Sequence, residues 1–272
     1  MKVFYLLLVF PSIFVVSSGK TVHNDKVKLS QRADEKTMEE ALLIFFEELR
    51  CRMNTPMDDL NLPTLDPFTA DSMDFDLDHN LGSISGTFSN LRIEGLSEFT
   101  VNDLRFNYNN LDFWIDTTLP RLSLSGYYDI DGSLGGLLPI FGNGNFSIVL
   151  TEMHAVINST IDYNGLTVAW NMPEFQMDFH LGNLTTVIDN LFNDDELSDF
   201  FNLAFTTLGA DIVDVMFSDI EPEIADMAKE MTSDLLNGVT IEKFLDIIFL
   251  IEPFLPPLAD GEVCEYEINY PL

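Results

Sequence analysis

Histidines and carboxylates are the residues of this sequence that could bind a metal or transfer protons. The four histidines are widely spaced, and the sequence holds neither an H-E-x-x-H nor a C-x-x-C motif, so no zinc site is predicted. Residues 82–86 have the glycine spacing of a G-x-S-x-G nucleophile elbow, but Ile84 takes the place of the nucleophile. These patterns favour a protein without catalysis, metal or cofactor, although a triad can also assemble from distant residues.

Three aspartates between Asp74 and Asp78 match the first, third and fifth positions of a calcium-binding loop. The sixth position of such a loop is a glycine and the twelfth is a glutamate, whereas this sequence has His79 and Ser85 there. At a spacing of two residues, the three carboxylates lie on one face of a strand. We therefore interpret them as a solvated strand face and not as a calcium site.

The overall composition is acidic and apolar at once. The formal net charge is −32, while 46% of the residues are hydrophobic and 23 are phenylalanines. Such a charge repels nucleic-acid phosphates and gives no attraction to anionic membranes, so both kinds of partner are disfavoured. The apolar content is too high for a disordered chain, and it predicts a large core that the acidic surface keeps soluble.

The first residues of the sequence predict secretion. Lys2 precedes an apolar run that is shorter than a membrane span, and small residues follow it. No later run is long and apolar enough to span a membrane, so we expect no stable membrane insertion. The predicted divisions are a signal peptide (1–19), a flexible leader (20–33), one folded domain (34–252) and a C-terminal extension (253–272).

Hydrophobic periodicity separates the domain into three parts. Apolar residues recur every three or four positions over 38–49, which predicts a helix. Over 71–179 they alternate with polar residues, and turn residues separate about seven or eight antiparallel strands, with a hairpin at Asn164-Gly165. The helical period returns at Asn183.

The last part of the domain is predicted to be helical. A long apolar helix runs from Asp195 to about Asp219, Pro222 kinks or ends it, and the pattern resumes as far as Gly238 before a final helix at 239–251. The apolar residues of the long helix occupy several of its sides, so it needs cover from more than one direction. We therefore predict an α+β fold, an elongated single domain in which a highly curved antiparallel sheet wraps the long C-terminal helix.

Five local patterns occur in an order that is similar to one known family. They are a proline-flanked segment after the first helix (Leu62–Phe68), N-x-x-x-x-G-L-S-x-F (Asn90–Phe99), x-P-x-L-x-L-x-G-x-Y (Leu119–Tyr128), L-P-I-x-G-x-G-x-F (Leu138–Phe146) and an L-D-N-L-F-N-type segment (Leu181–Asn193). With these patterns, residues 38–250 resemble the takeout and juvenile-hormone-binding protein family of arthropods. Mite group 7 allergens are a more distant resemblance.

The resemblance implies a tubular lipid-binding fold and secreted carriage of a small hydrophobic ligand, such as a fatty acid or a juvenile-hormone-like terpenoid. A hollow between the long helix and the aromatic strands could hold such a ligand, while solid core is the alternative for each residue. The candidate lining residues are Phe75, Phe88, Phe106, Phe113, Tyr128, Phe146, Phe175, Phe179, Phe205, Leu208, Ile212 and Met216. The alternative function is an extracellular structural or interaction protein, allergen-like, with a closed core. The sequence identifies no protein receptor.

Two cysteines and three sequons complete the predicted features. Members of the family usually carry two cysteines that bracket the first helix and join locally, whereas here no second cysteine lies near Cys51 and the only other one is Cys264. A disulfide between them is expected, with free thiols or an interchain bond as alternatives. The N-x-S/T sequons place possible glycans at Asn145, Asn158 and Asn183, which are expected at the surface.

Overall fold

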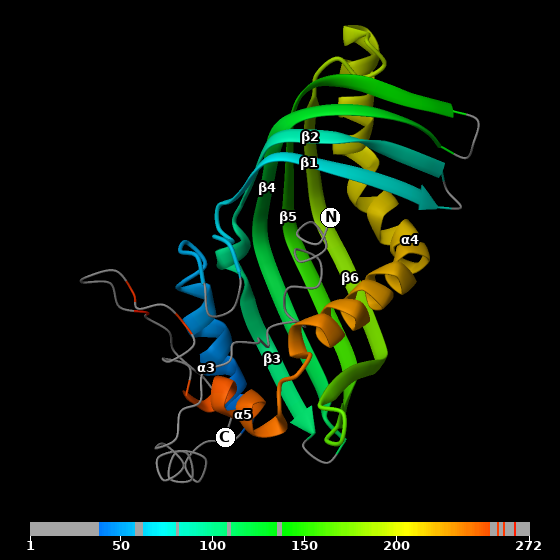
Figure 1. The fold of residues 1–272 in the computed structure, drawn as a ribbon. Helices are drawn as coiled ribbons and strands as arrows, with labels where there is room; N and C mark the ends of the chain where they lie inside the picture. The colour runs from blue at the N-terminus through cyan, green and yellow to red at the C-terminus, as the bar shows by residue number, and fades with distance from the viewer. Residues whose placement is uncertain are drawn as a thin grey trace.

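A computed structural model of the chain describes residues 38–57, 62–79, 82–107, 110–134 and 138–250, together with Leu255, Leu258 and Cys264. The predicted signal peptide, the leader and most of the C-terminal extension lie outside the described residues. The helices are α3 (Met38–Arg50), the short 3₁₀ helix η3 (Leu96–Glu98), α4 (Asp195–Leu236) and α5 (Ile241–Leu250). The strands are β1 (Phe68–His79), β2 (Gly82–Glu94), β3 (Thr100–Asn107), β4 (Asp112–Leu134), β5 (Leu138–Asn164) and β6 (Ala169–Ile188) (Figure 1).

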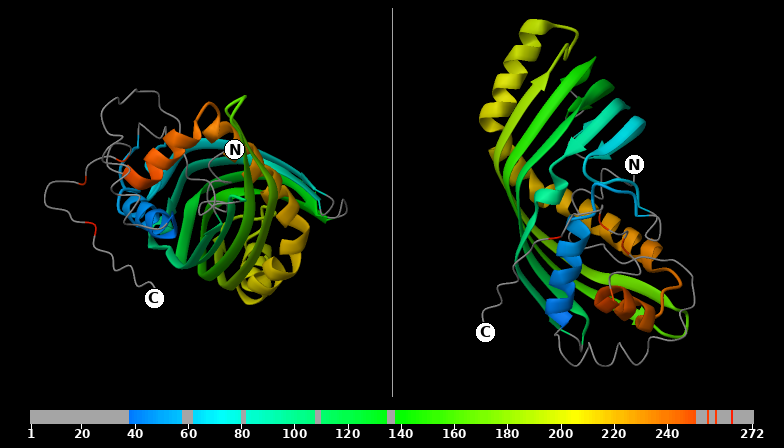
Figure 2. Two further views of the ribbon diagram at one scale, coloured as in Figure 1. Left: turned by 90° about the horizontal axis from the view of Figure 1, so that it is seen from below. Right: turned by 90° about the vertical axis from the view of Figure 1, so that its left-hand side faces the viewer.

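The six strands form one antiparallel sheet, in which five follow the order β1-β2-β4-β5-β6 and the sixth, β3, pairs with β4. Strand β3 pairs with the first part of β4 and β2 pairs with its second part, so that β2 and β3 follow one another along the same side of β4. Figure 2 shows how strongly the sheet curves, with the helices gathered beside it. The predicted α+β class with a curved antiparallel sheet and C-terminal helices is confirmed.

A line of irregular residues crosses the three longest strands. Pro120 of β4 lies opposite Glu152 of β5, which in turn lies opposite Gly182 of β6. Glu152 has a positive φ of 56°, and a Cβ atom at Gly182 would lie 2.6 Å from the Cβ of Glu152. Across this line the buried positions of β4 change from odd, as at Ile115, to even, as at Leu122. The strands keep their register here but change which residues face inward, which gives long strands a place to bend.

Helix α4 covers the free edge of β6. Aspartate and asparagine side chains of the helix accept hydrogen bonds from the backbone N–H groups of the strand, Asp214 from Leu181 and Asn202 from Ile188, both at 2.9 Å. Glu221 and Thr206 of the helix likewise accept hydrogen bonds from the backbone N–H groups of Met177 and Thr186. Polar side chains of α4 therefore take the place of a next strand and satisfy an edge that would otherwise be open to pairing.

The long helix is continuous through the proline at which the sequence predicts a kink or an end. It begins where the Asp194 carboxylate accepts a hydrogen bond from the Leu197 N–H at 3.0 Å, which is an N-cap. It passes through Pro222 and ends at Leu236, so the predicted end near Asp219 is wrong, whereas the predicted helical pattern as far as Gly238 agrees with the structure. Pro222 is exposed, while residues before and after it, such as Phe217, are buried. Packing on both sides of the proline thus keeps one helix where local preference predicts a break.

Three further predictions about the strands are wrong. The helical period expected from Asn183 belongs to β6, which pairs with β5 as far as Ile188, so tertiary pairing overrides a local pattern. The turn after Asn164 is longer than two residues, because Asn164 pairs with Ala169 and its side chain accepts a hydrogen bond from the Leu166 N–H at 3.0 Å. The strand count falls from seven or eight to six because β4 and β5 are 23 and 27 residues long.

A disulfide holds Cys264, in the predicted C-terminal extension, beside the first helix. Cys51 and Cys264 are bonded, with their Cα atoms 5.8 Å apart, as the sequence analysis expected. Cys51 directly follows α3, whose buried stripe, including Phe45 and Leu49, faces the core as predicted. The bond therefore connects Cys264 to the same end of the sheet at which α3 packs against β3 and α5.

Candidate ligand-binding site

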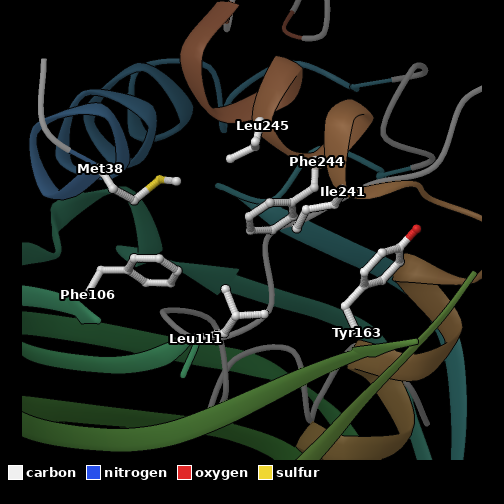
Figure 3. Close-up of a pocket in the computed structure, with 7 residues that line it drawn as sticks. All are labelled: Met38, Phe106, Leu111, Tyr163, Ile241, Phe244 and Leu245. Atoms are coloured by element: carbon white, nitrogen blue, oxygen red, sulfur yellow. The ribbon is translucent and has the colours of Figure 1, made fainter. Parts of the chain in front are cut away.

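A pocket of about 270 Å³ lies where α3, β3 and α5 meet the beginning of β4 and the end of β5. Figure 3 shows its side chains converging from these separate elements. The lining residues are Met38, Phe106, Leu111, Tyr163, Ile241, Phe244 and Leu245.

Helix α5 supplies one wall of the pocket. Its residues Ile241, Phe244 and Leu245 are three and four positions apart, so they share one face of the helix. The N–H of Lys243 donates a hydrogen bond to the Thr240 side chain at 3.2 Å, which caps the start of the helix. The short amphipathic helix therefore directs its apolar face toward the strands.

Trp170 fixes α5 against the sheet. The indole is fully buried, and its Nε1–H donates a hydrogen bond to the carbonyl of Val239 at 2.6 Å, directly before the helix. Its ring lies 4.6 Å from that of Tyr163 and 5.0 Å from that of Phe244, measured between ring centroids. Two of the lining residues are thus held by one buried aromatic residue, which makes this wall of the pocket preorganised.

The opposite wall joins α3 to β3. Met38 is the first described residue of α3, and Phe106 lies near the end of β3. The carboxylate of Glu39 accepts a hydrogen bond from the Phe106 N–H at 3.3 Å, so a negative charge lies at this wall. The pocket therefore combines an apolar interior with an acidic group beside it.

The lining of the pocket favours binding over reaction. Six of its seven side chains are apolar, and Figure 3 shows the hydroxyl of Tyr163 directed away from the others. Within the described residues, no group of three or more histidine, cysteine, aspartate or glutamate side chains is placed to hold a metal ion. What this arrangement can do is exclude water from a hydrophobic molecule.

One predicted lining residue, Phe106, lies in the pocket, and two others lie on the same row of the sheet. Phe106 pairs with Phe113, Phe113 pairs with Ser159, and Ser159 pairs with Phe175. Phe113 and Phe175 are buried. This row, Phe106–Phe113–Ser159–Phe175, runs across four strands from the pocket toward β6.

Four predicted lining residues pack against one another at the other end of the sheet. Phe75 and Phe88 are stacked with centroids 4.7 Å apart, and Phe146 lies 5.3 Å from Phe88 and 6.4 Å from Tyr128. We call these four residues the aromatic cluster. The Tyr128 hydroxyl donates to the Asp189 carbonyl at 2.6 Å, and burial, with the charge of Asp189, raises the pKa of Tyr128 to about 12.

The remaining predicted residues lie at or on α4. Phe179 of β6 stacks on Phe217 at 5.2 Å, and Phe205 packs 5.8 Å from Phe201. Met216 lies on α4, but its side chain is not among the described parts of the structure. Leu208 and Ile212 are 51% and 44% exposed.

Leu208 and Ile212 belong to an apolar stripe on the face of α4 that points away from β6. At helical spacing, this face is opposite the residues that bond the strand, such as Asn202. The exposed apolar residues of the stripe are Leu197, Phe200, Leu208, Ile212 and Val215. None of these side chains is among the lining residues of the pocket at α5.

Sequence reasoning missed the other lining residues of the pocket. The final helix was predicted, but Ile241, Phe244 and Leu245 were not nominated, although their spacing of three and four predicts one apolar face. Tyr163 lies shortly before the turn between β5 and β6, and Met38 begins the first helical stripe. Their convergence depends on the packing of α3 and α5, which no local pattern reveals.

The three sequon asparagines are all exposed. Asn145 and Asn158 lie on β5 and Asn183 lies on β6, each with its side chain at the surface. Their positions leave room for glycans, while glycosylation itself stays a prediction.

The described helices contain no segment that is long and apolar enough to cross a membrane.

Comparison with known proteins gives a family and a fold. The profile of the family described as haemolymph juvenile hormone binding protein matches residues 7–246. No curated protein matches the sequence of the chain.

Among solved structures, the crystal structure of Takeout 1 from Epiphyas postvittana is similar, with a TM-score of 0.54 at 17% sequence identity, covering 75% of this chain and 94% of that chain. At this identity the likeness shows the fold. A lipopolysaccharide binding protein matches with a TM-score of 0.27 and 10% identity over 66% of this chain and 35% of that chain, which is too low to support an argument.

Proposed function

Because the chain belongs to the haemolymph juvenile hormone binding protein family, we propose that it is a secreted carrier of a small hydrophobic ligand, a fatty acid or a terpenoid. The observation that supports the proposal is the apolar pocket between α3, α5 and the sheet. The family is one of binding proteins, and we propose no catalysis for this chain.

The size of the pocket suits one end of an elongated ligand. Sites for drug-sized molecules span about 300–1,000 Å³, so a volume of about 270 Å³ accommodates part of such a molecule. Burial of roughly 350 Å² of ligand surface at about 25 cal/mol per Å² contributes about 9 kcal/mol before the costs of association. A dissociation constant in the micromolar to high-nanomolar range is therefore expected.

Secretion is supported by two features of the chain. The Cys51–Cys264 disulfide is typical of proteins from an oxidising compartment. The N-terminal apolar run, which lies outside the described residues, has the composition of a signal peptide. N-terminal sequencing of the exported protein tests this point, with a mature start near residue 20 as the expected result.

The carrier function is tested by displacement of a fluorescent apolar probe from the purified chain. We expect saturable binding of the probe and its displacement by a long-chain fatty acid or a terpenoid, together with apolar molecules in an organic extract of the protein. If no member of a panel of apolar ligands displaces the probe and the extract is empty, the carrier proposal is wrong and a closed-core interaction protein takes its place.

A further inference from the structure

Ser159 is a buried hydroxyl group in the middle of the aromatic row that begins at the pocket. Its exposed fraction is 2%, and its neighbours in register, Phe113 and Phe175, are buried as well. Among the described residues its Oγ has no hydrogen-bond partner. A buried polar group without a partner is unfavourable and uncommon, and an alanine at this position would avoid the cost.

The hydroxyl lies on the same face of the sheet as the pocket. Side chains alternate along β5, so Ser159, Ile161 and Tyr163 point to one side, and Tyr163 lines the pocket. Residues paired across neighbouring strands also share a face, which connects Ser159 through Phe113 to Phe106 at the pocket. Ser159 is not itself among the lining residues, so a ligand would reach its hydroxyl only by extending from the pocket along this face of the sheet.

The charges around the pocket favour an uncharged ligand. No lysine or arginine is among the lining residues, and the Glu39 carboxylate lies at the wall formed by Phe106. A ligand carboxylate would lose its hydration in an apolar site without a cation and would meet this negative charge. A neutral oxygen of the ligand avoids both the desolvation of a charge and the repulsion from Glu39, and it can accept a hydrogen bond from a serine hydroxyl.

We propose that Ser159 is the polar anchor of the site and donates a hydrogen bond to an uncharged oxygen of the ligand, as in an ester, a ketone or an alcohol. This inference rests on the carrier function proposed above and narrows its ligand class. It gives Ser159 a role in specificity, since a hydrocarbon of equal length cannot accept the hydrogen bond and a carboxylate is disfavoured.

The test compares methyl palmitate, octadecane and palmitate as competitors of a fluorescent apolar probe. Wild-type protein is expected to bind the methyl ester most tightly of the three. Ser159→Ala is expected to weaken the ester by about three- to tenfold, the loss of one hydrogen bond, and to leave octadecane within twofold. The variant without ligand should be at least as stable as the wild type, because the unpartnered hydroxyl is gone.

Thr160→Ala is the matched control. Thr160 is the next residue on β5, and its hydroxyl faces the other side of the sheet, where it donates to the Asp112 carboxylate at 3.0 Å. Removal of this hydroxyl should leave the preference for the ester over octadecane unchanged.

The outcomes separate this inference from the carrier proposal. If all three competitors bind the wild type equally, or Ser159→Ala lowers the affinity for all of them by the same factor, Ser159 is not an anchor while the carrier function stands. Tightest binding of palmitate would likewise overturn the inference. If none of the three displaces the probe and no other apolar ligand does so, both the carrier function and the anchor are wrong.

Discussion

The two ends of the sheet use aromatic residues in different ways. At the end covered by α3 and α5, Phe106 and Phe244 stand apart across a pocket of about 270 Å³. At the other end, Phe75, Phe88 and Phe146 contact one another, with centroids as close as 4.7 Å. A high content of phenylalanine therefore does not locate a hollow. This pocket lies where the short helices α3 and α5 bridge the strands and keep Phe106 apart from Phe244, while Trp170 packs on Phe244 on one side of it.

The largest expected effect concerns the disulfide that ties the chain end to the pocket end. Cys51→Ser opens a link between residues 213 positions apart, for which chain entropy gives roughly 5 kcal/mol as a ceiling. We expect a fall of about 3–5 kcal/mol in the free energy of unfolding, measured by urea denaturation. Peptide mapping without reductant provides the control, because a Cys51–Cys264 peptide must be present in the wild type. A stability equal to that of the wild type would show that the extension does not support this end.

The next effect distinguishes packing from binding at the aromatic cluster. Phe146→Ala removes a buried ring that contacts Phe88 and Tyr128, and we expect it to lower the free energy of unfolding by about 3–4 kcal/mol. Probe affinity, measured below the unfolding transition, should stay within twofold of the wild type. A tenfold loss of affinity in the folded variant would place ligand in the cluster and remove the difference between the two ends.

The smallest effect concerns the hydroxyl of Tyr128. Tyr128→Phe loses one hydrogen bond to the Asp189 carbonyl, so stability at pH 8 should fall by about 1 kcal/mol. The folded-state pKa of about 12 lies above the ordinary value of 10.0, so the contribution of the hydroxyl is full below pH 10 and is lost as pH rises toward 12. The stability difference between wild type and variant should shrink over this range. A difference that is constant from pH 8 to 12 would contradict the raised pKa.

Sequence patterns predicted the fold better than the site. The stripe that contains Phe45 and Leu49 identified α3, and the compartment and cysteine count led to the disulfide pairing. The end of β6 at Ile188 was not predicted, and the sequence left open whether Pro222 kinks or ends α4, because pairing with β5 and packing beyond the proline decide these features.

The candidate site was predicted only at Phe106, where a strand pattern happens to reach the pocket. Phe244 and Met38 are far apart in the sequence, and they line the same pocket because α5 packs against α3. Leu208 was nominated because it belongs to a long apolar helix, yet it lies on the exposed stripe. A sequence shows that a side chain is apolar, whereas tertiary packing decides whether it faces a pocket, a neighbouring ring or solvent.

The central claim, that ligand occupies the pocket beside α5, is tested most directly by two tryptophan substitutions. Leu245→Trp fills the pocket, while Leu208→Trp adds the same bulk on the exposed stripe of α4. Displacement titration of the apolar probe should show at least a tenfold loss of affinity for Leu245→Trp, with a stability change below about 1.5 kcal/mol, and no more than a twofold change for Leu208→Trp. Unchanged affinity in Leu245→Trp together with a tenfold loss in Leu208→Trp would contradict the claim and place the ligand along α4.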